Sequence, residues 1–567
     1  MTIHDGGVFT YTGTATDSPG LTLVVYDNFL IRGGGTLISN KINLEASTIT
    51  IDDEGLLDVS NRGYDPGEGP GPGIDHNKGG SGASHGGRGG MGSFVINTTS
   101  AYDDVLNPTQ YGSGGSIGGG TQNTGSGGGI VMMSAFDMMT IDGTIMANGG
   151  TSDQPRNGGA SGGSINLHTD IFAGSGKIIS NGGDGACVPH CSVCDSERRC
   201  LQCTDYKYWR DSNCINDCNH SYNRRNHMRW SSPIKTGRYC ANERASPNEE
   251  WQIGGGGGGG RIGIYTMEEN RFRGEIQAYG GKSYKESGGA GTIYISNTTP
   301  NGTETTLKVN NRDKKPLRDH LLHELYEDSG RTYIVTDASH VTDYVFDHVH
   351  INQGAHLVFE KFENGTTPVE IGKLYGDLTG MIHSSGDYLI RITDSQSPFP
   401  ASFYIYEDSY MKLPKSLTVA QLDYQDIHLD GEMDGVHDLT IGRDINFHVG
   451  YEGHSSGRDK KTLSLHNLQI WADGEVQSWY PPDPYSPDIN PDYPSLVLDI
   501  KERLHIHPGG SLQTHWLEVT ADTILIDQAG VVDVSGQSRD YRNGGINSEY
   551  WGEDLQLLKY FRHSYNL

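Results

Sequence analysis

The sequence lacks several features that would place it in common functional classes. Apolar stretches such as LTLVV at residues 21–25 are far shorter than the roughly 20 residues needed to cross a bilayer, so we expect no membrane span. Basic residues are few: 43 Lys and Arg stand against 71 Asp and Glu, giving a formal net charge of −28. Nucleic acids and anionic membrane surfaces bind basic patches, so neither is expected as a partner. The opening residues, MTIHDGG, have neither the charged nor the apolar segment of a signal peptide, which leaves the compartment open.

Cysteine is absent from most of the chain and concentrated in one segment. All eight cysteines lie there: Cys187, Cys191, Cys194, Cys200, Cys203, Cys214, Cys218 and Cys240. An even, clustered set is typical of disulfide-bonded modules from an oxidising compartment, and the spacing resembles EGF-like or furin-like extracellular modules. Zinc is the alternative, because two Cys-x2-Cys pairs can hold a metal tetrahedrally. The second pair follows the first too closely for the usual zinc spacing, so we predict four disulfides, no metal and no cofactor.

Acceptor sites for N-linked glycans agree with secretion. Five Asn-x-Ser/Thr sequons occur, at Asn97, Asn219, Asn297, Asn301 and Asn364. Together with the cysteine segment, they predict an extracellular, secreted glycoprotein.

Glycine is abundant, at 80 residues, but without the Gly-X-Y period of collagen. The seven consecutive glycines 254–260 suggest a flexible linker, yet they run directly into RIGIY, which alternates like a strand. Three segments share this pattern of glycines, a strand, a polar stretch and a second strand, and residues 287–311 begin a fourth; the three are residues 127–150, 161–183 and 258–281.

A period near 24 residues with two or three strands per repeat is what stacked parallel coils require, since each coil is stable only against its neighbours. We therefore predict a mainly β protein, a right-handed parallel β-helix (solenoid) with a disulfide-rich insertion. The glycines would provide positive-φ corners and close backbone approach between coils, with a partly mobile linker as the alternative for residues 254–260. The one candidate helix is residues 316–328.

The repeats divide the chain into sections. They are N-terminal coils and Gly-rich loops (1–120), Gly-rich repeats (121–336) with the Cys-rich insertion (187–250), a second section (337–503) with a Pro-rich loop (478–494), and C-terminal coils (504–567). Residues 29–60 also align without a gap to residues 504–535 at a constant offset of 475 (509 minus 34), with Gly34 matching Gly509. Either the end of the chain repeats its beginning, or any two coils of one solenoid look alike.

Acidic pairs suggest catalysis only weakly. Asp52-Asp53 and Asp103-Asp104 are adjacent carboxylates, but neither has a nearby His and Arg in the sequence, and adjacent strand residues face opposite sides. The stretch Asp430–Gly435 has no distal bidentate Glu at calcium-loop spacing, so a turn is expected there. We therefore predict that the protein has no enzymatic activity.

Two histidine pairs at i, i+2 spacing would each share one strand face: His348 with His350, and His505 with His507. Two histidines can seed a zinc site, but no third ligand is assignable from sequence. A solvated or loop-facing pair is therefore expected in both places.

The strings GGGGGGGRIGIY and Gly-x-Ile-x-Ala-x-Gly-Gly, beside a cysteine-rich insertion, resemble the glycine-rich β-helix surface glycoproteins of protists and algae, and within them the subunits of tubular flagellar hairs (mastigonemes). That resemblance implies an extracellular structural protein of the cell or flagellar surface whose partners are copies of itself. The alternatives are a carbohydrate-binding adhesin and, less favoured, a polysaccharide lyase or hydrolase.

Overall fold

The computed structural model describes residues 1–185, 253–316, 329–336, 344–361, 369–449, 461–478 and 496–533, apart from interruptions of seven residues or fewer, together with residues 191–194 and 200–203. The chain divides into two compact units, one formed by residues 1–293 with 314–332 and the other by residues 294–313 with 333–567. Each unit is described here by itself.

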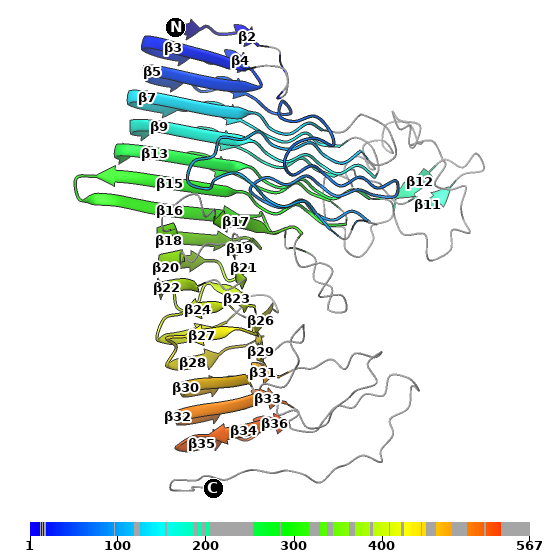
Figure 1. The fold of residues 1–567 in the computed structure, drawn as a ribbon, viewed down its shortest axis with the longest axis vertical. Coiled ribbons are helices and arrows are strands. Elements are labelled where there is room, and N and C mark those ends of the chain that lie inside the picture. Colours follow the sequence, from blue (N-terminus) through cyan, green and yellow to red (C-terminus); the bar gives the residue numbers. More distant parts are fainter. Residues whose placement is uncertain are drawn as a thin grey trace. The chain divides into compact units, whose positions relative to one another are not determined.

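Besides the short pair β11 (Cys191–Cys194) and β12 (Cys200–Cys203), the described part of the first unit has two sheets whose strands alternate along the chain (Figure 1). One sheet has, in order, β1 (Thr2–Ile3), β3 (Leu21–Ile31), β5 (Lys41–Ile51), β7 (Ile130–Ile141), β9 (Ser164–Ala173) and β13 (Arg261–Asn270). The other has, in the same direction, β2 (Val8–Thr10), β4 (Thr36–Ile38), β6 (Leu56–Asp58), β8 (Thr144–Met146), β10 (Lys177–Ile179) and β14 (Glu275–Gln277). We call a strand of the first sheet, with the strand of the second sheet that follows it, a layer.

Apolar residues at alternate positions hold successive layers together. In β5, Ile42, Leu44, Ile49 and Ile51 are fully buried, and the residues between them are more exposed. The parallel registers place like residues above one another, so that Ile51 lies between Ile31 and Ile141. Such ladders bury apolar surface only between layers, which explains why the repeats predicted at residues 127–150, 161–183 and 258–281 form β7–β8, β9–β10 and β13–β14.

The glycine run 254–260 lies in the middle of a bundle of extended segments, drawn as the narrow blue, cyan and green ribbons beside the sheets (Figure 1). Its backbone hydrogen bonds repeat every three residues. The amides of Gly255 and Gly258 donate to Gly80 and Ala83, those of Gly256 and Gly259 donate to Glu286 and Gly289, and those of Gly257 and Gly260 donate to Gly183 and Ser180, all at 2.8–3.0 Å. Three residues per turn is the period of the polyproline II helix, which makes no internal hydrogen bonds and must bond outward.

The carbonyl groups of the run accept from further segments, so that six surround it: residues 80–83, 86–90, 159–162, 180–183, 278–281 and 286–292. No side of the run is left for a side chain. A Cβ on Gly258 would lie 1.9 Å from the carbonyl oxygen of Gly87, and one on Gly255 would lie 1.8 Å from that of Gly90. Glycine is therefore required at both positions by close backbone contact.

The sequence expectations for this run are only partly correct. Close backbone approach is confirmed, whereas none of the seven glycines takes the positive-φ conformation that we expected of corners. Positive φ is found instead at layer corners such as Gly34, at +74°. The linker alternative is wrong, because the run is buried and bonded on every side.

The second unit contains parts of three sheets. The first has β15 (Thr292–Thr299), whose first two residues belong to the other unit, then β16 (Gly302–Asn310), β18 (Tyr344–Asn352), β20 (Val369–Gly376), β22 (Leu389–Ser395), β24 (Tyr410–Lys412) and β27 (Glu432–Asp434). The second has β17 (Thr332–Thr336), which also starts in the other unit, β19 (His356–Lys361), β21 (Gly380–Ser385), β23 (Ala401–Ile405), β26 (Gln425–Leu429), β29 (Ile445–Val449), β31 (Glu475–Gln477), β33 (Ser511–Gln513) and β36 (Val531–Asp533). The third has β25 (Ser416–Val419), β28 (Asp438–Ile441), β30 (Lys461–Ile470) and β32 (Leu496–Ile506), which pairs with both β34 (Leu517–Thr520) and β35 (Thr523–Ile526).

The long repeat at an offset of 475 residues (509 minus 34) is reproduced in three strands, while β5 corresponds to the two shorter strands β34 and β35. β32 and β33 have the bounds of β3 and β4 moved by that offset, and β36 has those of β6. The pairing registers also match, since Ile31 pairs with Ile51 and Ile506 with Ile526. The two segments therefore share one backbone arrangement, down to the left-handed corner at Gly34 and at Gly509.

The fold is mainly β with long parallel sheets, as predicted at that level, and the described residues include no helix. None of the described segments is a helix that is long and apolar enough to cross a membrane. The candidate helix (residues 317–328 of it) and the Pro-rich loop (residues 479–494 of it) lie outside the described residues.

Candidate functional site

The outer face of β30, β32 and β35 in the second unit carries a grid of polar side chains. Along β32, Leu504 and Ile506 are buried, so the alternate residues, including His505, face outward. The parallel registers align these residues in rows across the three strands: Asn467, Arg503 and Thr523 form one row, and Gln469, His505 and Leu525 form the next. Side chains far apart in the sequence thereby become neighbours.

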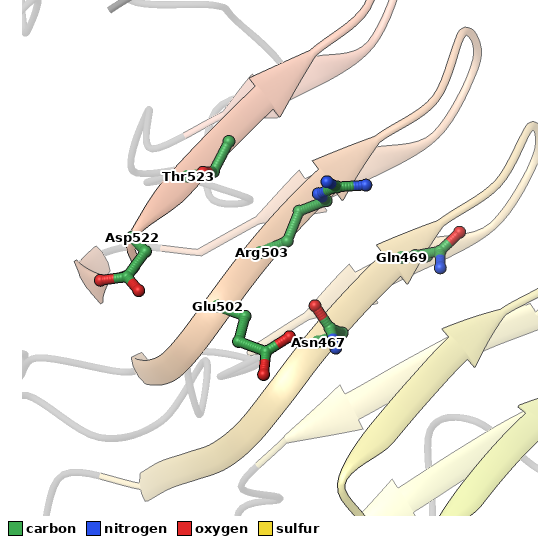
Figure 2. Close-up of a pocket in the computed structure, with 6 residues that line it drawn as sticks. All are labelled: Asn467, Gln469, Glu502, Arg503, Asp522 and Thr523. Carbon is green, nitrogen blue, oxygen red and sulfur yellow. Dashed lines mark hydrogen bonds between the residues drawn. The ribbon is translucent and has the colours of Figure 1, made fainter. Parts of the chain in front are cut away.

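An open pocket of about 460 Å³ lies on this face (Figure 2). Its lining is polar throughout: Asn467, Gln469, Glu502, Arg503, Asp522 and Thr523. Amide, carboxylate and guanidinium groups of this kind form planar hydrogen bonds with hydroxyl-rich ligands.

The pocket contains two carboxylates and an arginine, the combination that a polysaccharide-cleaving enzyme would need. Glu502 is already engaged, because Asn467 Nδ2 donates a hydrogen bond of 3.2 Å to its Oε2 and His466 Nδ1 lies 3.8 Å from its Oε1. Figure 2 shows Glu502 turned toward Asn467, and Asp522 beside Thr523 at the start of the neighbouring strand.

A cluster of three potential metal ligands borders the pocket: His505, His507 and Asp527. Asp527 Oδ2 lies 3.0 Å from His505 Nε2 and 3.7 Å from His507 Nδ1. The three ligand atoms all lie within 4.8 Å of one another. The sequence alone assigned no third ligand to this pair, and the structure brings Asp527 to the two histidines from the turn after β35.

The backbone fixes the cluster. Asp527 follows β35, and its amide donates to Ile506 O at 2.9 Å, which places it beside the end of β32. The ring of His507 stacks on Trp471, with centroids 4.5 Å apart. Burial and the neighbouring His505 lower the pKa of His507, while the charge of Asp527 acts in the opposite direction.

The other histidine pair has different surroundings. His348 Nε2 lies 2.7 Å from Glu304 Oε1, and the ring of His350 stacks on Tyr375 at 4.7 Å. Burial, then the charges of Lys308 and His348, lower the pKa of His350 to about 4. His350 is thus half-buried against an aromatic ring and a lysine, which differs from the solvated pair expected.

A row of aromatic rings lines one sheet of the second unit, which the sequence did not indicate. His383, Tyr404, His428 and His448 are aligned in the parallel registers of β21, β23, β26 and β29, and all four are buried. The rings of His428 and His448 lie 4.7 Å apart and nearly parallel. This ladder packs four successive strands together.

The acidic pair Asp103-Asp104 has partners that sequence reasoning missed. Asp103 Oδ2 lies 3.1 Å from Nε2 of the fully buried His85, whose Nδ1 lies 2.7 Å from the carbonyl oxygen of Gly162. A carbonyl oxygen can only accept, so His85 donates from Nδ1 to Gly162 O, while its Nε2 faces the carboxylate of Asp103. Burial would raise the pKa of Asp103, but the hydrogen bond and charge of His85, with the charge of Arg261, lower it.

The buried contact between His85 and Asp103 ties the loop around Asp103 to the glycine bundle. Arg261, directly after the glycine run, is 1% exposed and donates from Nε to Tyr102 O at 3.0 Å. Since His85 and Asp103 are 0% and 2% exposed, no substrate can reach them, and we assign them a structural role. The other acidic pair stays at a surface corner, where Asp53 Oδ1 accepts from Glu54 N. Asp430 lies in the turn between β26 and β27, as expected.

The predicted disulfide and glycan sites are described only in part. β11 (Cys191–Cys194) and β12 (Cys200–Cys203) form an antiparallel pair, while the cysteine side chains lie outside the described residues. Asn97 and Asn301 are exposed, and Asn297 is half-buried in β15. Asn219 and Asn364 are also outside the described residues. The four disulfides and the glycans therefore stay predictions.

Comparisons with known proteins give no relative: no family model, no curated protein and no solved structure matches this chain.

Proposed function

We propose that the protein is an extracellular structural glycoprotein, a repeating subunit of a surface or flagellar filament. In this proposal the chain is a right-handed parallel β-helix with a disulfide-rich insertion, and copies join head to tail through the ends of the stacked layers. The supporting observation is the exposure of core-type residues on the last strands.

Ile526 of β35 is 50% exposed, whereas its equivalent in the long repeat, Ile51, is fully buried beneath β7. Val532 of β36 is 38% exposed, and its equivalent, Leu57, is fully buried beneath β8. The same residue positions are thus covered where another layer follows and exposed where none follows among the described strands. A further layer of this kind would bury them.

The first unit also has an uncovered sheet edge. Val8 and Phe9 of β2, the outermost strand of its sheet, are 65% and 38% exposed. An uncovered edge of this kind adds strands from another chain, and a head-to-tail contact that does not close into a ring propagates as a fibre. A longer polypeptide containing tandem copies of this chain would give the same rod.

Charged substitutions at the edge test the proposal. Ile526→Asp and Val532→Asp should abolish rods with a regular axial repeat in electron micrographs and reduce sedimentation to that of a monomer. Val345→Asp is the matched control, because Val345 is 47% exposed but lies on β18, which has strands on both sides. Wild-type protein that sediments as a compact monomer at high concentration, without rods, would refute the proposal.

A carbohydrate-binding adhesin is the second candidate, supported by the polar pocket of Figure 2. The neighbouring Trp471 is 48% exposed and offers a flat surface for stacking on a sugar ring. Binding of soluble glycans that is lost in Arg503→Ala, in a protein that forms no rods, would favour the adhesin.

A further inference from the structure

We propose that His505, His507 and Asp527 form a binding site for a divalent transition-metal ion, with Zn²⁺ as the representative. This inference does not depend on the filament proposal. Two ligands that share one zinc ion at about 2.0–2.2 Å lie roughly 3.0–3.5 Å apart. The observed separations from Asp527 Oδ2, 3.0 Å to His505 Nε2 and 3.7 Å to His507 Nδ1, are close to that range. All three ligand atoms lie within 4.8 Å of one another, so side-chain rotations alone would bring them to one ion.

The site is held in place by ordered backbone on both sides. The corner after β32 is closed by Gly510 N donating to His507 O at 2.9 Å, and the corner after β35 by Gly530 N donating to Asp527 O at 2.8 Å. His507 Nε2 lies 3.5 Å from Gln469 Oε1, which favours a proton on Nε2 and leaves Nδ1 free for a metal. Ligands preset in this way lose little conformational freedom when the ion binds.

The ligand types point to the class of ion. Two imidazoles with one carboxylate suit zinc, copper or nickel, whereas calcium and magnesium prefer oxygen ligands alone. The side chains of His505, His507 and Asp527 are 18%, 19% and 43% exposed, so the ion can enter from solvent. Three protein ligands leave at least one coordination position for water or a fourth ligand from outside.

The chain contains a natural comparison for this site. At the equivalent corner of the long repeat, Leu30, Arg32 and Asp52 replace His505, His507 and Asp527. The backbone there is the same: Asp52 N donates to Ile31 O at 2.9 Å, as Asp527 N does to Ile506 O. Both copies of the repeat therefore place an aspartate at this corner, and only the copy with His505 and His507 adds two imidazoles.

Calorimetric titration of the full, metal-free chain with Zn²⁺ tests the site, after the thiols have been blocked so that the cysteine segment cannot take up the ion. We expect one tight Zn²⁺ per chain in the wild type. The His505→Asn/His507→Asn double variant and Asp527→Asn should each bind it at least tenfold more weakly. His466→Asn is the matched control, because His466 lies on β30 and is 35% exposed but outside the cluster. Its affinity should equal that of the wild type.

A spectroscopic readout locates the ion. Because Trp471 stacks on His507 at 4.5 Å, Cu²⁺ should quench part of the tryptophan fluorescence, and Trp471→Phe should remove that part. Unchanged Zn²⁺ affinity in the site variants, or equal weakening in His466→Asn, would overturn the proposal. If the site variants fail to fold, the two histidines can instead be introduced at the equivalent corner of the first unit. Leu30→His/Arg32→His should take up a second Zn²⁺ beside Asp52, and the absence of a second ion would overturn the proposal.

Discussion

Replacing Gly258 by alanine tests whether the glycine run is a packed element. The added Cβ would lie 1.9 Å from the carbonyl oxygen of Gly87. That segment cannot move away freely, because the amide of Gly87 donates to Gly259 O and the amide of Gly258 donates to Ala83 O. Any shift that relieves the contact stretches these hydrogen bonds.

The change in stability expected for Gly258→Ala is opposite in sign to the change expected if the run were a flexible linker. In a flexible segment, Gly→Ala stabilises a protein by about 0.4–1 kcal/mol, because it restricts the unfolded chain. In the bundle, overpacking costs about 1–3 kcal/mol, and two weakened backbone hydrogen bonds add about 1 kcal/mol each. We expect a net loss of roughly 3–5 kcal/mol, or a decrease in melting temperature on the order of 10 °C for a unit of this size.

Thermal unfolding followed by circular dichroism measures the shift, and hydrogen exchange at the amides of residues 80–90 and 255–260 locates it. Gly6→Ala is the control: its φ is +68°, but a Cβ there meets nothing within 4 Å, so only about 1–2 kcal/mol of backbone strain is expected. A Gly258→Ala protein that unfolds at or above the wild-type temperature would refute the packing argument.

Three further predictions follow from single groups and from the secreted state. Asp103→Asn should destabilise the protein by about 1–3 kcal/mol, since it replaces the carboxylate oxygen that contacts the buried His85 ring and accepts from Ser164 Oγ. Because the folded-state pKa of Asp103 is lowered, the stability that this carboxylate contributes should be lost as pH falls through that pKa, and a melting curve insensitive to acid would contradict it. NMR titration should give His350 a pKa of about 4, and this pKa should be higher in Lys308→Ala. The protein should become less stable as pH falls from about 6.5 toward 4, because the unfolded chain protonates His350 at a higher pH than the folded protein does. Mass spectrometry of the native protein should show no free thiol among its eight cysteines. It should also show glycans at the described sequons, Asn97, Asn297 and Asn301, and an unmodified mass would remove the evidence for secretion.

The strands were predictable because their signal is local. Alternation of apolar residues in a segment such as RIGIY, and the offset that relates Gly34 to Gly509, need only neighbouring residues or direct comparison of two stretches. Both features reappear in the strand bounds and registers.

The candidate site and the glycine bundle could not be predicted, because both arise from contacts between distant segments. Asp527 reaches His505 and His507 only because β35 pairs with β32, a register that no spacing rule for metal ligands includes. His85 likewise meets Asp103 across a loop inside the bundle. A run of glycine carries no side-chain pattern, so its six neighbours leave no trace in its own composition.

Because the hydrogen bonds of the glycine run repeat every three residues, the length of the run sets the direction in which the later backbone groups point. Each residue of a three-per-turn helix turns the backbone by about 120°, and in residues 254–260 each direction faces a different neighbour. Loss or gain of one glycine would turn every donor beyond it toward the wrong segment, whereas loss of three would restore the angle. The number of residues in the run, and not only their being glycine, therefore determines which neighbouring segments its backbone groups bond to.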